Sequence, residues 1–289
     1  MTTAPDVQRT TPNTAPRRVW VGDRLLEAEE ATVAATDHGL VAGGGVFESL
    51  KVTGRGAFAV TRHLQRLSRS AAALGLPEPD HALVRTAVEA VVEGRDYDLG
   101  IVRVTWTGGV GPLGSGRAFG PPTLVVADAP AAWPPEETAV VTVPWTRNEH
   151  GAMTGVKTTS YGENVRGLAY AVERDASEGI FCNTAGHVCE GTGSNLFVVV
   201  DGEVVTSPLS SGALAGVTRA LVLEWAEVSE RDLTLAEAQA ADEVFLTSSL
   251  RDVQRVTRWD DHRYSADGPV TGRLRRLFAE RSESDWDPR

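Results

Sequence analysis

The order of strand-like and helical segments restricts the fold of this chain more than any other feature of its sequence. Residues 17–35 and 46–60 each alternate apolar and polar residues around a glycine-containing turn, a pattern that predicts two β-hairpins. Residues 61–76 and 80–94 then carry apolar side chains at helical spacing. Strands and helices therefore mix without the regular alternation of repeated β-α-β units, which favours a mixed α/β (α+β) fold over a doubly wound parallel sheet.

The second half of the chain has the same mixed character. A strand is predicted at residues 139–145, a helix from about Asn164 to Glu178, and further short strands and helices after it. The proline-rich stretch that follows the first half is typical of a linker. These patterns predict a disordered tail at 1–17, an N-terminal domain at 18–128, an interdomain linker at 129–138, a larger domain at 139–281 and a disordered tail at 282–289.

Charge and composition exclude several function classes. With 39 acidic and 28 basic residues the chain has a formal net charge of −11, so we expect no general attraction to nucleic acid or to an anionic membrane surface. No apolar run reaches the ~18 residues of a membrane span, and the first residues lack the apolar segment of a secretory signal, so we expect a cytoplasmic protein. Neither the two cysteines nor the six histidines have metal-ligand spacing, so we expect no metal site.

Lysine is almost absent from this chain, which contains 26 arginines but only Lys51 and Lys157. An ammonium can lose its proton and become a nucleophilic amine, whereas a guanidinium cannot, so a retained lysine is a candidate for covalent chemistry. Lys157 lies at a predicted junction between a strand and a loop. The alternative interpretation of any single lysine is an ordinary surface charge, so its neighbours in the sequence decide.

Three further features of the second half complement Lys157. Glu190 lies between two strand-like pieces, the small residues of "SSGALAGVTR" lead into a predicted helix, and "FLTSS" ends a predicted strand in hydroxyl groups. The N-terminus of a helix presents free N–H groups that suit a phosphate. An amine, a carboxylate and a phosphate site are what pyridoxal 5′-phosphate (PLP) requires of a protein, so we predict this cofactor.

Six stretches of the chain resemble, in the same order, the motifs of the class IV aminotransferases, which are the fold-type IV PLP enzymes. They are "DHGLVAGGGVFESLKV", "HLQRL", "VKTTSYGENV", "CEGTGSNLFVV", "SSGALAGVTR" and "DEVFLTSS", and the likeness extends over residues 19–279. The resemblance implies a two-domain fold with a small N-terminal α/β domain and a larger, β-barrel-like C-terminal domain with helices. It also implies a homodimer in which a loop of the partner completes each active site.

The resemblance implies roles for individual residues as well. Lys157 would form a Schiff base with PLP and shuttle the proton at the substrate Cα, Glu190 would pair with the pyridinium nitrogen, and Tyr161 would contact the phenolic oxygen. A carboxylate beside the ring nitrogen favours its protonated form. The residues that would hold the phosphate are Arg66, Val217, Thr218, Ser248 and Ser249.

The predicted substrate side departs from several branches of this family. Ala42 lies in a segment of small residues where other members often have an aromatic side chain, and Arg103, within a predicted strand, is a candidate to bind a substrate carboxylate. Ser49 stands where aminodeoxychorismate lyases have a threonine. We expect an aminotransferase that acts on an amino acid (or amine) and a 2-oxo acid. The alternatives are a 4-amino-4-deoxychorismate lyase, which forms p-aminobenzoate and pyruvate by elimination, and an inert cofactor-binding homologue.

Overall fold

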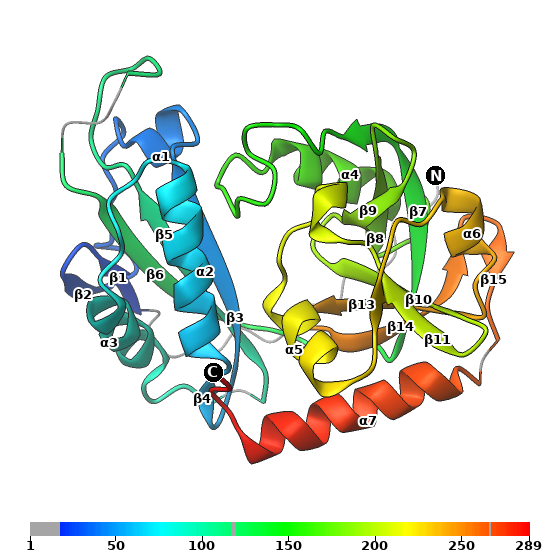
Figure 1. Ribbon diagram of the computed structural model, residues 1–289. Coiled ribbons are helices and arrows are strands. Elements are labelled where there is room, and N and C mark those ends of the chain that lie inside the picture. Colours follow the sequence, from blue (N-terminus) through cyan, green and yellow to red (C-terminus); the bar gives the residue numbers. More distant parts are fainter. Residues whose placement is uncertain (1–17, 97, 117–119, 266) are drawn as a thin grey trace, which may run out of the picture.

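The computed structural model describes residues 18–96, 98–116, 120–265 and 267–289, so the predicted tail at 1–17 lies outside the described residues. Two β-sheets stand side by side, one from each half of the chain (Figure 1). Neighbouring strands of the first sheet are all antiparallel, in the order β2-β1-β6-β5-β3-β4. Its strands are β1 (Arg18–Val21), β2 (Arg24–Glu27), β3 (Gly45–Thr53), β4 (Gly56–Ala57), β5 (Gly100–Thr107) and β6 (Thr123–Pro130).

Two amphipathic helices, α2 (Val60–Ala73) and α3 (His81–Val92), pack against the first sheet (Figure 1). Leu64 and Leu67 of α2 are fully buried with the sheet's apolar side chains, as their helical spacing predicts. Asp80 caps the N-terminus of α3, and its carboxylate accepts hydrogen bonds from two N–H groups of the first turn. A short helix, α1 (His38–Val41), precedes β3.

The second sheet is mixed, with the strand order β12-β11-β10-β13-β14-β7-β8-β9 and β15 paired to β14. Strand β7 is parallel to both of its neighbours, β14 and β8. This combination of sheets and helices confirms the mixed α+β class. The strands are β7 (Glu137–Arg147), β8 (Glu178–Asn183), β9 (Val188–Gly191), β10 (Asn195–Val200), β11 (Glu203–Thr206), β12 (Ser229–Glu230), β13 (Glu243–Ser248), β14 (Asp252–Trp259) and β15 (His262–Arg263).

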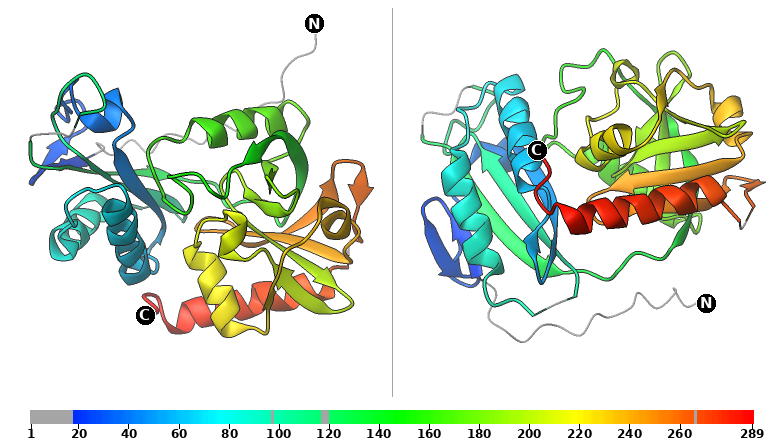
Figure 2. Two further views of the ribbon diagram at one scale, coloured as in Figure 1. Left: turned by 45° about the horizontal axis from the view of Figure 1, so that its top comes forward. Right: turned by 60° about the horizontal axis from the view of Figure 1, so that its bottom comes forward.

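The helices of the second half lie around this sheet (Figures 1 and 2). They are α4 (Gly162–Val172), α5 (Val217–Trp225), α6 (Leu235–Gln239), α7 (Pro269–Ser284) and the 3-10 helix η1 (Leu209–Ser211). Helix α4 ends well before Glu178, where the sequence pattern placed its end, because the chain turns through Asp175 in the left-handed region (φ 53°) and Glu178 already opens β8. No helix among the described residues is long and apolar enough to cross a bilayer.

The prediction of a disordered tail at 282–289 is wrong. Helix α7 continues to Ser284, and the last residues then reach the N-terminal end of α2 in the first half (Figure 2). The carboxylate of Asp287 accepts hydrogen bonds from the backbone N–H and the hydroxyl of Thr61, both at 2.7 Å. The Trp286 indole donates a hydrogen bond to a backbone carbonyl of the first half at 3.2 Å. A polar tail sequence conceals these contacts, because their partners lie more than two hundred residues away.

Candidate active site

A cavity of about 1020 Å³ opens between the two halves of the molecule. Its walls come from β3, β5 and α2 on one side and from the loops around β7, β9 and β13 on the other. Ten of the eleven predicted site residues line it: Lys157, Glu190, Arg66, Val217, Thr218, Ser248, Ser249, Tyr161, Arg103 and Ser49. Ala42 is the exception, since it is exposed and is not among the lining residues, so the structure does not bring it to this site.

Lys157 belongs to the second half but is held by the first. Its backbone N–H donates to the Ser70 hydroxyl at 3.2 Å, and its carbonyl accepts from the Phe47 N–H at 2.9 Å. The amine lies 4.4 Å from the centroid of the Phe47 ring. Burial, helped by the charge of Arg66, lowers the pKa of Lys157 to about 8. A much larger fraction of this amine is therefore neutral and nucleophilic near neutral pH than of an ordinary lysine.

Glu190 is buried on β9, with its carboxylate directed toward the cavity. One oxygen accepts from the Leu214 N–H at 2.8 Å, and the other lies 3.7 Å from a guanidinium nitrogen of Arg147. Burial raises the pKa of Glu190, although Arg147 and the Leu214 N–H oppose the change. A cationic group placed beside this carboxylate would offset the cost of burying its charge.

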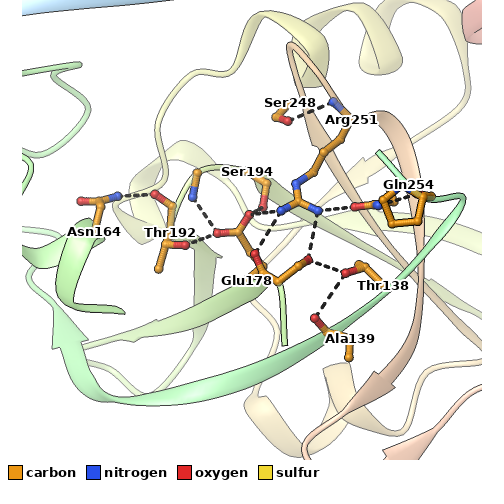
Figure 3. A network of polar contacts seen from close by, with 12 residues as sticks. Thr138, Ala139, Asn164, Glu178, Thr192, Ser194, Ser248, Arg251 and Gln254 are labelled. Atoms are coloured by element: carbon orange, nitrogen blue, oxygen red, sulfur yellow. Dashed lines mark hydrogen bonds and ion pairs between the residues drawn. The ribbon is translucent and has the colours of Figure 1, made fainter. Parts of the chain in front are cut away.

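A second buried acid, Glu178, fixes the turn that follows Glu190 (Figure 3). Its carboxylate accepts from the Thr192 hydroxyl, from the Gly193 N–H at 2.9 Å and from the Ser194 hydroxyl at 3.1 Å. Arg251 completes the network with a nitrogen 3.3 Å from Glu178 (Figure 3). Glu178 was not predicted as a site residue, because the sequence pattern placed it at a helix end, whereas it lies at the start of β8.

The same turn orients Tyr161. The carbonyl of Thr192 accepts from the Tyr161 hydroxyl at 3.1 Å and from the Asn164 side chain at 2.7 Å. Burial, together with the charges of Glu190 and Glu178, raises the pKa of Tyr161 to about 12. The phenol is therefore protonated and acts as a donor throughout the neutral range.

One end of the cavity is rich in hydrogen-bond donors. Helix α5 begins without a side-chain cap, so its first N–H groups, at Val217 and Thr218, face the cavity free of such a partner. Arg66 lies beside this helix end and donates to the Ala215 carbonyl at 3.1 Å. The N-cap is Gly216, where a Cβ would lie only 2.0 Å from the Asn195 amide oxygen. The chain therefore needs glycine at this entry to the helix. Ser248, the last residue of β13, and Ser249, in the turn after it, add hydroxyl groups.

The opposite wall carries the candidate substrate-binding residues. Ser49 on β3 and Arg103 on β5 are register partners, so both lie at the same level of the first sheet. The Arg103 guanidinium lies 3.7 Å from the centroid of the Phe47 ring. Phe47 contacts both the lysine and this arginine but was not predicted as a site residue. Its position two residues before Ser49, on the same strand face, was a usable signal.

The groups in the cavity fit PLP. The amine of lowered pKa suits its aldehyde, the carboxylate of raised pKa suits a protonated ring nitrogen, and the uncapped helix end with Arg66 suits its phosphate. Within the described residues no cluster of acidic, histidine or cysteine side chains is arranged to hold a metal ion.

Comparisons with known proteins agree with this geometry. A family model described as amino-transferase class IV matches residues 45–259. The D-alanine aminotransferase of Listeria innocua is 28% identical over 282 residues, covering 91% of this chain and 95% of that protein. The branched-chain-amino-acid aminotransferase of Pseudomonas aeruginosa is 27% identical over 282 residues, covering 90% and 91%. The branched-chain aminotransferase of Thermoproteus uzoniensis, solved with norvaline, superposes with a TM-score of 0.85 at 27% identity, covering 92% and 94%. A PLP-bound hypothetical aminotransferase of Mycobacterium tuberculosis superposes with a TM-score of 0.82 at 28% identity, covering 93% of this chain and 99% of that chain.

Proposed function

Because this chain belongs to the class IV aminotransferase family, we propose that the cavity between its two sheets is the active site and that Lys157 is the catalytic residue. The protein is a PLP-dependent aminotransferase, with amino acids and 2-oxo acids as its substrates. The observation that carries the proposal is the half-buried amine of Lys157 in the wall of the cavity, where desolvation lowers its pKa to about 8.

Each lining residue has a task in this proposal. When bound, PLP supplies an electron-withdrawing ring that makes the substrate Cα–H acidic. Lys157 would hold the cofactor covalently, and as a neutral amine it would take the proton from the substrate Cα. Glu190 would keep the ring nitrogen protonated, and Tyr161 would turn its single hydroxyl proton from the Thr192 carbonyl toward the phenolic oxygen. The phosphate is held by Arg66, Val217, Thr218, Ser248 and Ser249, which line the donor-rich end of the cavity.

The substrate wall supports an α-amino acid with an apolar side chain. Arg103 is the cation of this wall that we assign to the substrate carboxylate, with the Ser49 hydroxyl beside it. Phe47, Ile101 and Leu168 supply apolar surface to the same cavity. The relatives named for branched-chain amino acids and for D-alanine agree with a small or apolar side chain.

A panel of amino donors tests this function. The purified enzyme with PLP and 2-oxoglutarate should convert apolar amino acids to their 2-oxo acids with formation of glutamate. Borohydride should fix the cofactor on the peptide that contains Lys157, and Lys157→Ala should lose both the adduct and the turnover. A reduced adduct on any other peptide would overturn the assignment. Release of p-aminobenzoate and pyruvate from aminodeoxychorismate, without an amino acceptor, would indicate the lyase reaction instead.

We further propose a homodimer. Helix α4 presents an apolar stripe at helical spacing, in which Val165, Leu168 and Val172 are 63%, 42% and 62% exposed. Val165 and Leu168 also line the cavity, so a second copy packed on this stripe would help to close the site. Light scattering should give twice the chain mass. We also propose a cytoplasmic location, supported by the two free thiols of Cys182 and Cys189.

A further inference from the structure

A buried carboxylate stands behind the arginine at the donor-rich end of the cavity. Glu48 on β3 is 0% exposed, and both of its oxygens are engaged. One accepts from the Arg66 Nε at 2.8 Å, and the other accepts from the Arg66 Nη2 at 2.6 Å. The second oxygen also lies 2.7 Å from the His63 Nδ1. The guanidinium is thus held by a two-point fork, which fixes its plane as well as its position.

The free side of this guanidinium reaches across to the other half of the molecule. Its Nη1 donates to the Ala215 carbonyl, one residue before the N-cap of α5. Arg66 therefore stands between a rigid strand of the first sheet and the uncapped end of a helix in the second half. We propose that Glu48 is a positioning residue, which orients Arg66 for the phosphate of PLP. This inference rests on the proposed function, in which Arg66 and the α5 N-terminus hold that phosphate.

If only its charge mattered, Glu48 would weaken phosphate binding, whereas a positioning role predicts that Glu48 strengthens it. Burial by itself would raise the pKa of Glu48, but the charge and hydrogen bonds of Arg66, assisted by His63, lower it to about 2. Glu48 is therefore ionised in the working range, and its negative charge repels a phosphate dianion. Burial also lowers the pKa of His63, so the ring donates to Glu48 without adding a charge. If Glu48 acted only as a counter-charge, neutralising it should strengthen phosphate binding; if it positions Arg66, neutralising it should weaken binding.

The dissociation constants of PLP and of pyridoxal, which lacks the phosphate, separate these cases. In Glu48→Gln the amide presents an N–H to the guanidinium in place of an acceptor, so the fork is lost. We expect PLP to dissociate at least about tenfold more readily, with little change for pyridoxal. Glu48→Asp keeps the charge but shortens the reach, and it should also weaken PLP binding selectively. This second variant serves as the test if the first does not fold.

A matched control is Glu243→Gln. Glu243 is 7% exposed and accepts from the N–H groups of Val270 and Thr271 at the start of α7, so this variant also removes a buried carboxylate from its donors. Glu243 does not line the cavity, and the affinity for PLP should be unchanged in this variant. An equal loss of PLP affinity in Glu243→Gln and Glu48→Gln would overturn the inference, because both would then report general destabilisation.

Arg66→Lys distinguishes a failure of this inference from a failure of the proposed function. If Arg66→Lys leaves the affinity for PLP unchanged, the phosphate does not need the guanidinium and the proposed role of Arg66 is wrong. If Arg66→Lys weakens PLP but Glu48→Gln binds it as tightly as the wild type or more tightly, only the positioning role is overturned. In the Arg66→Lys background, Glu48→Gln should have little further effect on the PLP dissociation constant. A full additional loss there would show that Glu48 does not act through Arg66.

Discussion

An ion pair in an unusual setting joins the two halves of the molecule. Lys51 of β3 places its amine 2.6 Å from a carboxylate oxygen of Asp252 at the start of β14. The amine also lies 5.0 Å from the ring of Phe58 and 5.9 Å from each of the rings of Phe278 and Trp286. Replacing this lysine by methionine keeps most of the apolar length of the side chain beside the aromatic rings, and removes the charge together with its hydrogen bonds to Asp252.

The expected loss of stability follows from the burial of the pair. The Lys51 side chain is 5% exposed and that of Asp252 is 27% exposed. Removing one partner of a fully buried pair costs about 3–5 kcal/mol, whereas an exposed pair contributes about 0–1 kcal/mol. Since Asp252 retains some access to water, we expect Lys51→Met to lower the free energy of unfolding by about 2 kcal/mol.

This loss should depend on pH. Burial raises the pKa of Asp252 even though Lys51 opposes the change, so removing Lys51 should raise that pKa further. Between its unfolded value and this raised value, folded Asp252 binds more protons than unfolded Asp252, so the variant gains stability as the pH falls through this window. The deficit relative to the wild type should therefore be larger at about pH 8 than at about pH 5.

Urea unfolding, followed by far-UV circular dichroism at one fixed PLP concentration, measures both effects. The double variant Lys51→Met/Asp252→Asn removes both charges, and asparagine tolerates the left-handed backbone (φ 51°) at this position, so it should recover most of the loss. Arg24→Met is the matched control, because its pair with Asp23 is exposed on both sides. A loss of stability in Lys51→Met no larger than in this control, or equal at both pH values, would contradict a stabilising role for the ion pair.

Two further outcomes follow from the structure. Deleting residues 285–289 removes the carboxylate of Asp287 from the Thr61 N–H at the start of α2, and should lower Tm by about 5 °C in calorimetry; an unchanged Tm would show that the tail contributes no stability. Glu190→Gln keeps the size of the side chain but cannot hold a cationic ring nitrogen, so PLP should stay bound while kcat falls about a hundredfold; near-normal turnover would contradict the role of Glu190.

Much of the fold could be predicted from local patterns. The helix predicted at 61–76 is α2, and the turn predicted at Gly22 joins β1 to β2, because helical spacing and glycine turns act over a few residues. The end of α4 could not be placed in this way. The chain leaves the helix through Asp175 without the glycine that usually marks such an end, so the sequence carries no clear stop signal.

In the candidate site, too, only the residues with local sequence signals could be predicted. Lys157 and Glu190 are recognisable because their chemistry requires those residue types. Glu48 and Glu178 were not, because their importance comes from partners distant in the sequence: Arg66 lies 18 residues from Glu48, and the turn held by Glu178 lies 14 to 16 residues away. A glutamate in the sequence is usually a solvent-exposed acid, and only the folded structure shows that Glu48 and Glu178 are buried.

The position of Lys157 links the stability of the sheet contact to the chemistry. Its loop belongs to the second half, yet its carbonyl accepts from Phe47 and the Thr159 N–H donates to Gly45, both on β3 of the first sheet. Glu190 belongs wholly to the second sheet. Any displacement of one sheet against the other therefore changes the distance between amine and carboxylate, the two groups that must reach the same cofactor. Lys51 lies on the same strand as Phe47 but does not line the cavity. Lys51→Met should nevertheless weaken PLP binding in proportion to the loss of stability that it causes.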